Sequence, residues 1–315
     1  MQKVTIVIPN YNGRRLLENC LKTLENQTYT DFKVLIIDNG STDGSKEIIS
    51  DTLDMEIVSL ETNLGFCGAV NLGIQMTNTP YIILLNNDTE TDRYFVETLL
   101  KAIERSEKIF SCGAQMIDFQ NHKILDNAGD LYTAMGWAVA RGKGKRCIDY
   151  EKKKRVFSCC AGAAIYRMDI LNQIGGLDEH HFAYLEDVDL GYRARIHGFE
   201  NWYIPEAKVY HVGSATTGAR YNEKKVFLAA RNTIFVIYKN MPVLQLALNV
   251  PFIFTGMLIK TLFFVRKGFG EDYCKGILEG ICDCKKCWKV KFRIKNLSNY
   301  FKIQLELWCN LVRII

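Results

Sequence analysis

The sequence has few prolines and no glycine-, serine- or proline-rich tract, which excludes a collagen-like fibre and a flexible linker protein. Only 5 of its 315 residues are proline, and it has no internal repeat, so a solenoid or propeller is excluded too. Instead, 48% of the residues are hydrophobic and 24% are charged, which is typical of a packed globular protein. The length fits one large domain, or a main domain with an appendage.

The sequence also shows no secretory leader. The first apolar run, at residues 4–9, is too short for a signal-peptide core and lacks a cleavage site. The 11 cysteines are an odd number in a large chain, which argues against a disulfide framework. We therefore expect reduced thiols and a cytoplasmic compartment.

The net charge of +5 is unevenly distributed. Residues 231–315 carry a net charge of +9, whereas the first 230 residues carry −4. A basic tail on a mildly acidic body predicts that the tail meets an anionic partner, either a membrane face or a nucleic acid. Because the body has no basic face evident from the sequence, we expect no nucleic-acid binding.

Apolar β-branched runs alternate with helical spacing in the first part of the chain. We expect strands at residues 4–8, 33–37, 57–60 and 81–85, and helices at 14–27, 45–53 and 67–77. This alternation predicts an α/β fold with a Rossmann-like, mostly parallel sheet flanked by helices. Ligands bind such sheets at the carboxyl ends of the strands. In this sequence each of those ends is followed by a polar segment. These segments are Pro9–Asn12, Asp38–Asn39, Asn63–Gly65 and Asn86–Asp88.

The second part of the chain has a looser pattern. We expect helices at 93–107, 168–173 and 184–197, and strands at 160–166, 202–204 and 207–210, with an irregular region at 110–160. Within that region, residues 141–155 are rich in lysine and arginine. They form either a mobile, solvated loop or a loop that contacts an acceptor substrate or a phosphate group.

Acidic residues at strand and helix ends are the first candidates for chemistry. Asp88 either caps a turn or binds a divalent cation such as Mg²⁺ or Mn²⁺, which prefers oxygen ligands. Glu186 and Asp187 open a helix, where they either complement its dipole or supply a general base. Asp189 lies two residues on, faces elsewhere on the helix, and is expected to be structural.

One histidine stands out from the five in the chain. His211 ends an expected strand and precedes the polar segment 212–218, which we expect to be flexible enough to close over a ligand. Its imidazole would then reach a metal. His180 and His181, just before the acid pair, are weaker candidates.

Five segments occur in the order and at the spacing of a known family. They are Val-Ile-Pro-Asn-Tyr-Asn-Gly (7–13), Ile-Ile-Asp-Asn-Gly-Ser-Thr-Asp-Gly-Ser (36–45), Asn-Leu-Gly-Phe (63–66), Leu-Leu-Asn-Asn-Asp-Thr (84–89) and Tyr-Leu-Glu-Asp-Val-Asp-Leu (184–190). Over residues 3–240 the chain resembles a family 2 glycosyltransferase of GT-A fold. It is most similar to the rhamnosyltransferase-like branch, which builds bacterial surface polysaccharide.

The resemblance implies a role for each matching residue. The nucleotide would be held by Pro9, Asn10, Tyr11, Asn12, Asp38, Asn39, Asn63, Gly65 and Asn87. Asp88 would bind a divalent cation, Mn²⁺ or Mg²⁺, together with the diphosphate, and His211 would coordinate the same metal. The chain departs from the family's Asp-x-Asp motif by having Asn86 at the first position. Asp187 would be the catalytic base of a single displacement with inversion, supported by Glu186.

The resemblance also implies a reaction and its partners. A sugar, with rhamnose as the candidate, would pass from a dTDP- or UDP-sugar to a lipid-linked or polysaccharide acceptor. A sugar-nucleotide pyrophosphorylase is an alternative, but it needs a glycine-rich loop with a basic residue, which residues 9–13 lack. A non-catalytic nucleotide-sugar-binding membrane protein is another, and the presence of Asp88, Asp187 and His211 argues against it.

The C-terminal region is expected to be a helical appendage. Residues 241–265 approach the length needed to span a membrane, but polar residues and a proline interrupt them. We therefore favour an amphipathic element lying on the membrane over a spanning helix. Residues 288–315 mix aromatic with basic side chains, which suits an anionic membrane face. The alternative is a helical cap on the catalytic domain or on a twin chain in a homodimer. The interrupting residues are Gln245, Asn249, Pro251 and Lys260.

This organisation predicts three parts. Residues 1–112 form the nucleotide-sugar-binding half of the main domain, residues 113–240 form the acceptor-binding and catalytic half, and residues 241–315 form the basic appendage. Four cysteines in the appendage are either free thiols or a zinc site, and their spacing is not that of a standard zinc knuckle. They are Cys274, Cys282, Cys284 and Cys287.

Overall fold

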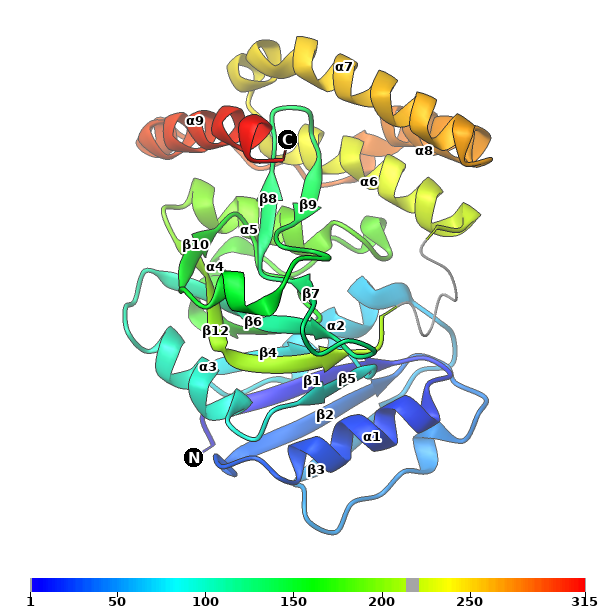
Figure 1. Cartoon of the computed structure of the whole chain (residues 1–315), viewed down its shortest axis with the longest axis vertical. Coiled ribbons are helices and arrows are strands. Elements are labelled where there is room, and N and C mark those ends of the chain that lie inside the picture. Colours follow the sequence, from blue (N-terminus) through cyan, green and yellow to red (C-terminus); the bar gives the residue numbers. More distant parts are fainter. Residues whose placement is uncertain (1, 214–220, 315) are drawn as a thin grey trace.

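The computed structural model describes residues 2–213 and 221–314, and it places a mixed β-sheet between layers of helices (Figure 1). The strand order in the main sheet is β10-β12-β6-β11-β4-β1-β2-β3, with β5 paired to β12 and β7 paired to β6. The strands are β1 (Val4–Asn10), β2 (Phe32–Asp38), β3 (Met55–Ser59), β4 (Tyr81–Leu85), β5 (Thr89–Thr91), β6 (Ile109–Asp118), β7 (Leu125–Asn127), β10 (Lys154–Val156), β11 (Ala163–Arg167) and β12 (Glu200–His211).

The first half of the sheet is parallel, as the alternating pattern predicts. Strand β1 pairs in parallel with β2 and with β4, and β2 pairs in parallel with β3. In this register Asn10 lies opposite Asp38, and Asp38 lies opposite Ser59. The polar segments that follow these strands therefore start from one edge of the sheet.

The second half of the sheet differs from the mostly parallel prediction. Strand β11 runs antiparallel to both β4 and β6, while β12 is parallel to β6. Strand β12 is one strand of 12 residues where two short strands are predicted. Its register shifts between Ile204 and Lys208, around Pro205, which has no N–H to donate to a ladder. The bulge absorbs the proline, and the strand continues to His211.

The helix predicted at residues 45–53 is wrong, because only the 3-10 turn Ser45–Glu47 forms there. Ile49, which would be part of an apolar face, is 85% exposed. The hydroxyl of Ser50 accepts hydrogen bonds from the backbone N–H groups of Thr52 and Leu53, both at 3.3 Å. Such local bonds compete with helical ones.

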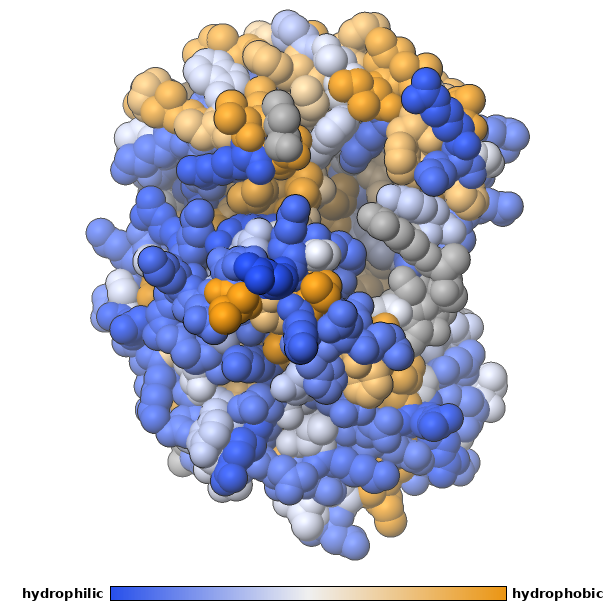
Figure 2. Space-filling view, in the orientation of Figure 1, coloured by the Kyte–Doolittle hydropathy of each residue, from blue (hydrophilic) through white to orange (hydrophobic). Residues whose placement is uncertain are grey.

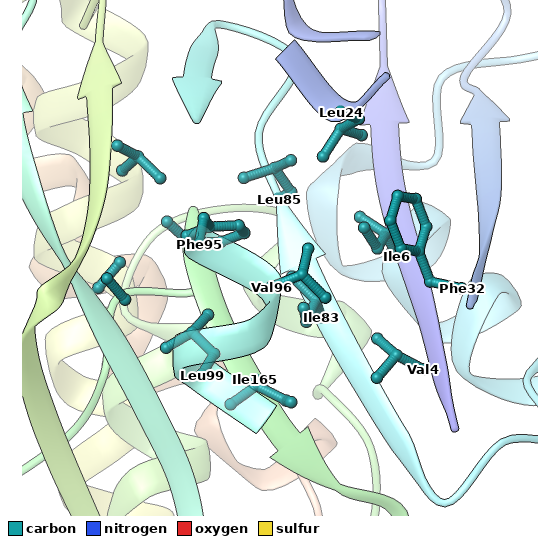
Figure 3. Packing of buried hydrophobic residues seen from close by; sticks show 14 of the residues in the cluster. Val4, Ile6, Leu24, Phe32, Ile83, Leu85, Phe95, Val96, Leu99 and Ile165 are labelled. Carbon is teal, nitrogen blue, oxygen red and sulfur yellow. The ribbon is translucent and has the colours of Figure 1, made fainter. Parts of the chain in front are cut away.

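Helices cover both faces of the sheet. Buried side chains of α1 and α3, among them Leu24 and Phe95, pack on one face with strand residues such as Ile83 (Figure 3). On the other face lie α2, α4 and α5. The helices are α1 (Arg14–Leu24), α2 (Gly65–Met76), α3 (Phe95–Ile103), α4 (Met168–Ile174), α5 (Glu186–Ile196), α6 (Glu223–Asn240), α7 (Val243–Arg266), α8 (Gly270–Asp283) and α9 (Leu297–Arg313).

Helices α6 to α9 form a further layer above α5 (Figure 1). A hairpin of β8 (Asp130–Tyr132) and β9 (Ala138–Ala140) reaches up to this layer, where Ala134 N donates to the carbonyl of Leu307 at 3.2 Å. Gly256 of α7 packs against the hairpin, because a Cβ there would lie 2.7 Å from Cβ of Met135. The predicted helical appendage is thus packed against the main domain.

Helix α7 is continuous from Val243 to Arg266, with Pro251 inside it. Two of its polar side chains are buried against the body of the protein: Tyr192 Oη donates to Gln245 Oε1 at 2.8 Å, and Asn249 and Gln304 exchange two bonds of 2.8 Å. The helix is long and apolar enough to span a membrane by composition, with a mean hydropathy of 1.7. Its polar face points inward and its apolar face outward.

The exposed apolar side chains of α7 and its neighbours gather at one end of the molecule, and we call this set the apolar cap (Figure 2). The apolar cap consists of Val243, Leu244, Leu248, Val250, Phe254, Leu258, Ile259, Leu262, Phe263, Val265, Leu278, Ile281, Leu297, Phe301, Leu305, Trp308 and Val312.

Candidate functional site

Asn10 connects three strand ends at the carboxyl edge of the sheet. Its Nδ2 donates to Asp38 Oδ1 at 3.1 Å, and its Oδ1 accepts from Asn87 Nδ2 at 2.6 Å. Gly13 lies against this group, because a Cβ there would be 2.3 Å from Asn87 Nδ2. The polar segments after β1, β2 and β4 therefore meet, as the sequence predicts.

A second group joins Asn39 to the segment that precedes α2. Asn39 Nδ2 donates to Asn63 Oδ1 and to the carbonyl of Gly65, both at 3.0 Å. Leu64 N donates back to Asn39 Oδ1 at 2.8 Å. Gly65 has a φ of +76°, and a Cβ there would lie 2.5 Å from the ring of Phe182. Only glycine fits this position without displacing the loop that precedes the acid pair.

The remaining predicted nucleotide residues frame the same edge. Pro9 is the penultimate residue of β1. Tyr11 is 39% exposed, and Asn12 adopts a φ of +49° while its Oδ1 accepts from Thr42 N at 2.8 Å. This bond ties the segment after β1 to the segment after β2. An exposed aromatic ring beside a polar edge is a suitable surface for stacking a nucleotide base.

Asp88 and His211 lie next to each other, as predicted for a metal site. His211 Nε2 is 3.3 Å from Asp88 Oδ1, and His211 Nδ1 is 2.8 Å from Asp126 Oδ2. Lys143 Nζ donates to the other oxygen of Asp126 at 2.6 Å. Burial opposes the charged imidazole, but its hydrogen bonds to the carboxylates of Asp126 and Asp88 raise the pKa of His211 to about 9. Asp126 is a site residue that the sequence reasoning missed.

This donor set fits a divalent cation. A carboxylate oxygen and a ring nitrogen face each other, and the second ring nitrogen is fixed by a carboxylate, as is common for metal-binding histidines. The predicted flexible segment 212–218 lies mostly outside the described residues, which stop at residue 213 before resuming at 221.

The acid pair stands in the first turn of α5, but its members differ. Asp187 is partly exposed and accepts bonds from Val188 N at 2.7 Å and Ala161 N at 3.4 Å. Glu186 is buried, and its Oε2 has no hydrogen-bond partner among the described residues. Burial raises the pKa of both, and the charge of Asp187 further raises that of Glu186. Both burial and the neighbouring carboxylate therefore disfavour the charged form of Glu186.

A third carboxyl lies near the pair. Asp130, in β8, accepts from Asn127 Nδ2 at 2.8 Å and from Ser158 Oγ at 3.2 Å. Burial and the nearby charge of Asp187 raise the pKa of Asp130. The sequence did not single out Asp130, because nothing near residue 130 resembles a motif.

A turn before β11 links the acid pair to the segment that contains Asp88. Asn86 N donates to the carbonyl of Gly162 at 2.9 Å, and the neighbouring Ala161 N donates to Asp187. Asn86 is two residues before Asp88, so Asp88 and Asp187 share a connected set of loops. Asp38 is connected through Asn10 to Asn87, the residue before Asp88. Asp38, Asp88 and Asp187 therefore lie on segments that are hydrogen-bonded to one another.

Asp189 has a structural environment, as expected. It is fully buried between Arg193 Nε at 3.0 Å and Lys239 Nζ at 3.0 Å, and Lys239 also bonds Asp178 at 2.6 Å. Although burial opposes it, these cations hold the pKa of Asp189 well below its usual range. Trp288 lies over both cations, with ring distances of 4.8 Å and 4.5 Å. The network joins α5, α6 and the C-terminal region.

The four cysteines of the C-terminal region do not gather into one metal site. Among residues 2–213 and 221–314, the one group of ligand-type side chains within 4.8 Å of one another is Asp178, His180 and Cys287. Asp178 is already paired with the ammonium group of Lys239. Cys274 and Cys282 are exposed and Cys287 is buried, so these thiols are unpaired and separate.

The fold and the site define a GT-A glycosyltransferase. In this class a parallel half-sheet carries polar loops at the carboxyl ends of its strands, next to an acid pair. Residues 5–175 match the model of the family "Glycosyl transferase family 2", which covers more than half of the chain. The chain belongs to this family, and its relatives include rhamnosyltransferases.

Two curated relatives illustrate the similarity. An N-acetylglucosaminyl-diphospho-decaprenol L-rhamnosyltransferase of Mycobacterium tuberculosis is 26% identical, with 72% of this chain and 84% of that protein aligned. The O-antigen chain rhamnosyltransferase RfbN of Salmonella typhimurium is 27% identical, with 72% of this chain and 73% of that protein aligned.

Two solved structures share the fold. The mannosyltransferase PcManGT from Pyrobaculum calidifontis, in complex with GDP-Man and Mn²⁺, superposes with a TM-score of 0.56 at 12% identity, over 90% of this chain and 86% of that one. S. aureus TarS 1-349 in complex with UDP-GlcNAc superposes with a TM-score of 0.54 at 15% identity, over 93% and 94%. At these identities the likeness establishes the GT-A fold alone.

Proposed function

We propose that this glycosyltransferase is an inverting, metal-dependent enzyme that transfers a sugar, with rhamnose the favoured candidate, from a dTDP- or UDP-sugar. The observation that carries this proposal is the difference in environment between Glu186, which is buried, and Asp187, which is partly exposed. Asp187 is the partly exposed member and accepts hydrogen bonds from two backbone N–H groups. A carboxylate whose pKa is raised above its usual range is a better proton acceptor near neutral pH than an ordinary one.

In this mechanism Asp187 accepts the proton of the acceptor hydroxyl as its oxygen attacks the anomeric carbon. The attack comes from the face opposite the departing nucleoside diphosphate, so configuration inverts in one displacement. The predicted nucleotide residues, from Pro9 to Asn87, hold the donor so that the reacting atoms are aligned. Glu186 stays protonated beside Asp187 and supports it without competing for the same proton.

The metal proposal assigns Asp88 and His211 as the residues that hold Mn²⁺ or Mg²⁺. When bound, the cation neutralises charge on the departing diphosphate. Asp126 fixes the imidazole ring of His211 through Nδ1 and leaves Nε2 directed toward Asp88. PcManGT was solved with Mn²⁺, which supports a divalent cation for this fold.

The acceptor is proposed to be lipid-linked or a growing surface polysaccharide. The names of the two rhamnosyltransferase relatives, which specify a diphospho-decaprenol and an O-antigen chain, support this class. The three-part division of the chain follows: residues 1–112 bind the nucleotide sugar, 113–240 carry the base and the acceptor site, and 241–315 face the lipid.

We further propose that the apolar cap lies on the cytoplasmic face of a membrane. In α7 the polar side chains of Gln245 and Asn249 point into the protein while Leu248 and Phe254 point out, the reverse of a soluble helix. Basic residues of the same region supply attraction to anionic lipid. Because α7 is hydrogen-bonded to α5 and α9, it is proposed to lie along the surface rather than span it. The competing occupant of the cap is a second copy in a homodimer.

A donor panel tests the reaction. The protein is incubated with Mn²⁺ and dTDP-rhamnose, UDP-glucose, UDP-galactose or GDP-mannose, and released nucleotide and glycosylated polyprenyl-diphosphate acceptor are measured. We expect one dTDP- or UDP-sugar to be consumed, with inversion at the anomeric carbon. The variant Asp187→Asn should bind the same nucleotide and lose transfer. Wild-type transfer by that variant would overturn the assignment of the base.

A further inference from the structure

The loop immediately before the acid pair has an unusual backbone. Phe182 adopts φ 60° and ψ −58°, and Ala183 N donates to the carbonyl of His181 at 2.7 Å, which makes a γ-turn of the rare type with positive φ. Tyr184 and Leu185 follow with φ values of 73° and 65°. None of these residues is glycine, so the conformation persists only because the surroundings hold it.

Asn232 of α6 holds this loop from one side. Its side chain is fully buried, and its Nδ2 donates to the carbonyls of His181 at 3.0 Å, Ala183 at 2.8 Å and Tyr184 at 2.8 Å. One amide group thus gathers three carbonyl oxygens of the strained loop. The neighbouring Arg231 adds bonds from Nη2 to the carbonyls of His180 at 2.8 Å and His181 at 3.1 Å.

The loop is held from the opposite side by the start of α2. Cys67 N donates to the carbonyl of Phe182 at 3.0 Å, and Gly65 leaves room for the ring of Phe182. Two turns further along α6, Lys239 and Asn240 bond the carboxylate of Asp189 at 3.0 Å and 2.8 Å. Helix α6 therefore contacts the chain on both sides of Glu186 and Asp187.

We propose that Asn232 is a positioning residue for Asp187: it holds the strained loop 181–185 so that α5 begins at Glu186 and the Asp187 carboxylate is directed toward the acceptor hydroxyl. This inference rests on the proposed role of Asp187 as base. A base displaced by about 1 Å costs about 100-fold in rate, even when the altered residue never touches the substrate.

The test compares Asn232→Ala with Thr233→Ala in the full-length chain. Thr233 is the next residue on α6 and is also buried, but its hydroxyl donates within the helix to the carbonyl of Ala229 at 2.8 Å. We expect kcat of Asn232→Ala to fall by about 10- to 100-fold, with the KM of the donor and the Kd of the nucleotide changed by no more than about twofold. Thr233→Ala should keep the wild-type kcat. Rates are expressed per folded enzyme, measured by circular dichroism.

A second variant and a pH profile separate positioning from simple stability. Asn232→Ser keeps one donor, and its kcat should lie between those of the wild type and Asn232→Ala. The acidic limb of the kcat–pH profile should shift in both Asn232 variants, because Asp187 changes its surroundings, and it should not move in Thr233→Ala. A wild-type kcat per folded enzyme in Asn232→Ala, or equal losses in kcat and nucleotide affinity, would overturn the proposal.

The variant Asp187→Asn, measured alongside, distinguishes the two levels of inference. If Asp187→Asn loses transfer while Asn232→Ala keeps it, the positioning role is wrong and the base assignment stands. If Asp187→Asn keeps transfer, the base assignment is wrong, and Asn232 has no catalytic side chain to position.

Discussion

The Nδ1 atom of His211 lies 2.8 Å from Asp126 Oδ2, while the Nε2 atom of the same ring faces Asp88 at 3.3 Å. The ring is thus fixed by one carboxylate and directed toward another. Asp126 and His211 come from β7 and β12, two strands that both pair with β6. Because outer carboxylates of this kind set the tautomer of metal-binding histidines, the pair makes a prediction about metal affinity.

We predict that Asp126→Ala weakens Mn²⁺ binding by about 10- to 100-fold, because His211 loses the group that orients it. Isothermal titration of Mn²⁺ into the protein with saturating UDP measures this directly. The control is Asp149→Ala, which removes an exposed carboxylate paired with Arg146. Unchanged Mn²⁺ affinity in Asp126→Ala would contradict the assignment of His211 as a ligand oriented by Asp126.

Gly65 links the nucleotide loop to the loop before the base. We predict that Gly65→Ala destabilises the protein by roughly 1–3 kcal/mol, because it strains a positive φ, and that it also lowers kcat, because it displaces Phe182. Gly144→Ala is a matched control, since Gly144 has the same φ of +76° and nothing within 4 Å of an added Cβ. Chemical denaturation and kcat should separate strain alone, seen in Gly144→Ala, from strain plus displacement. Equal kcat in the two variants would count against the link.

The buried Glu186 predicts a pH-dependent stability. Burial and the charge of Asp187 raise its pKa to about 8 in the folded state, whereas the unfolded chain releases this proton near pH 4.3. Between these values the folded state binds more protons, so stability falls as the pH rises toward 8. Glu186→Gln should flatten this decline in thermal unfolding from pH 5 to 9. The exposed control Glu206→Gln should retain it, and a decline of unchanged slope in Glu186→Gln would refute the raised pKa.

The apolar cap predicts lipid binding. Leu248→Gln combined with Phe254→Gln should reduce binding to vesicles that contain anionic phosphatidylglycerol by roughly tenfold or more, since two large apolar side chains leave the bilayer. Co-sedimentation measures the bound fraction, and Ile49→Gln, which alters an exposed side chain on the body, is the control. Absence of vesicle binding by the wild type, with a dimer in sedimentation that the double variant dissolves, would assign the cap to a homodimer instead.

Much of the nucleotide-binding half could be predicted from local patterns. The strands β1, β2 and β4 are continuous apolar runs, and each ends in turn-forming polar residues, so both their positions and their shared edge follow from the sequence. The wrong helix at 45–53 and the divided strand at 202–210 have local causes. The Ser50 hydroxyl competes with helical bonds in the first case, and Pro205 is absorbed by a bulge in the second.

The appendage shows a different limit. In the sequence, Gln245 and Asn249 interrupt an apolar run. In the structure they are buried against Tyr192 and Gln304, which lie about 50 residues away in the chain. A sequence pattern gives the polarity of each residue but not which side of a helix the rest of the protein covers. The inward polar side and outward apolar side of α7 are therefore evident only from its contacts with α5 and α9.

The amino-acid sequence alone determined the family, the parallel half-sheet and the identities of the rim residues, because these depend on short runs and on their spacing. Only the tertiary structure decided that Asp126 contacts His211, that Glu186 is buried while Asp187 is partly exposed, and that Asn232 bonds the carbonyls of a strained loop. Those features arise from burial and from contacts between segments distant in the chain, and neither is encoded in any local pattern of residues.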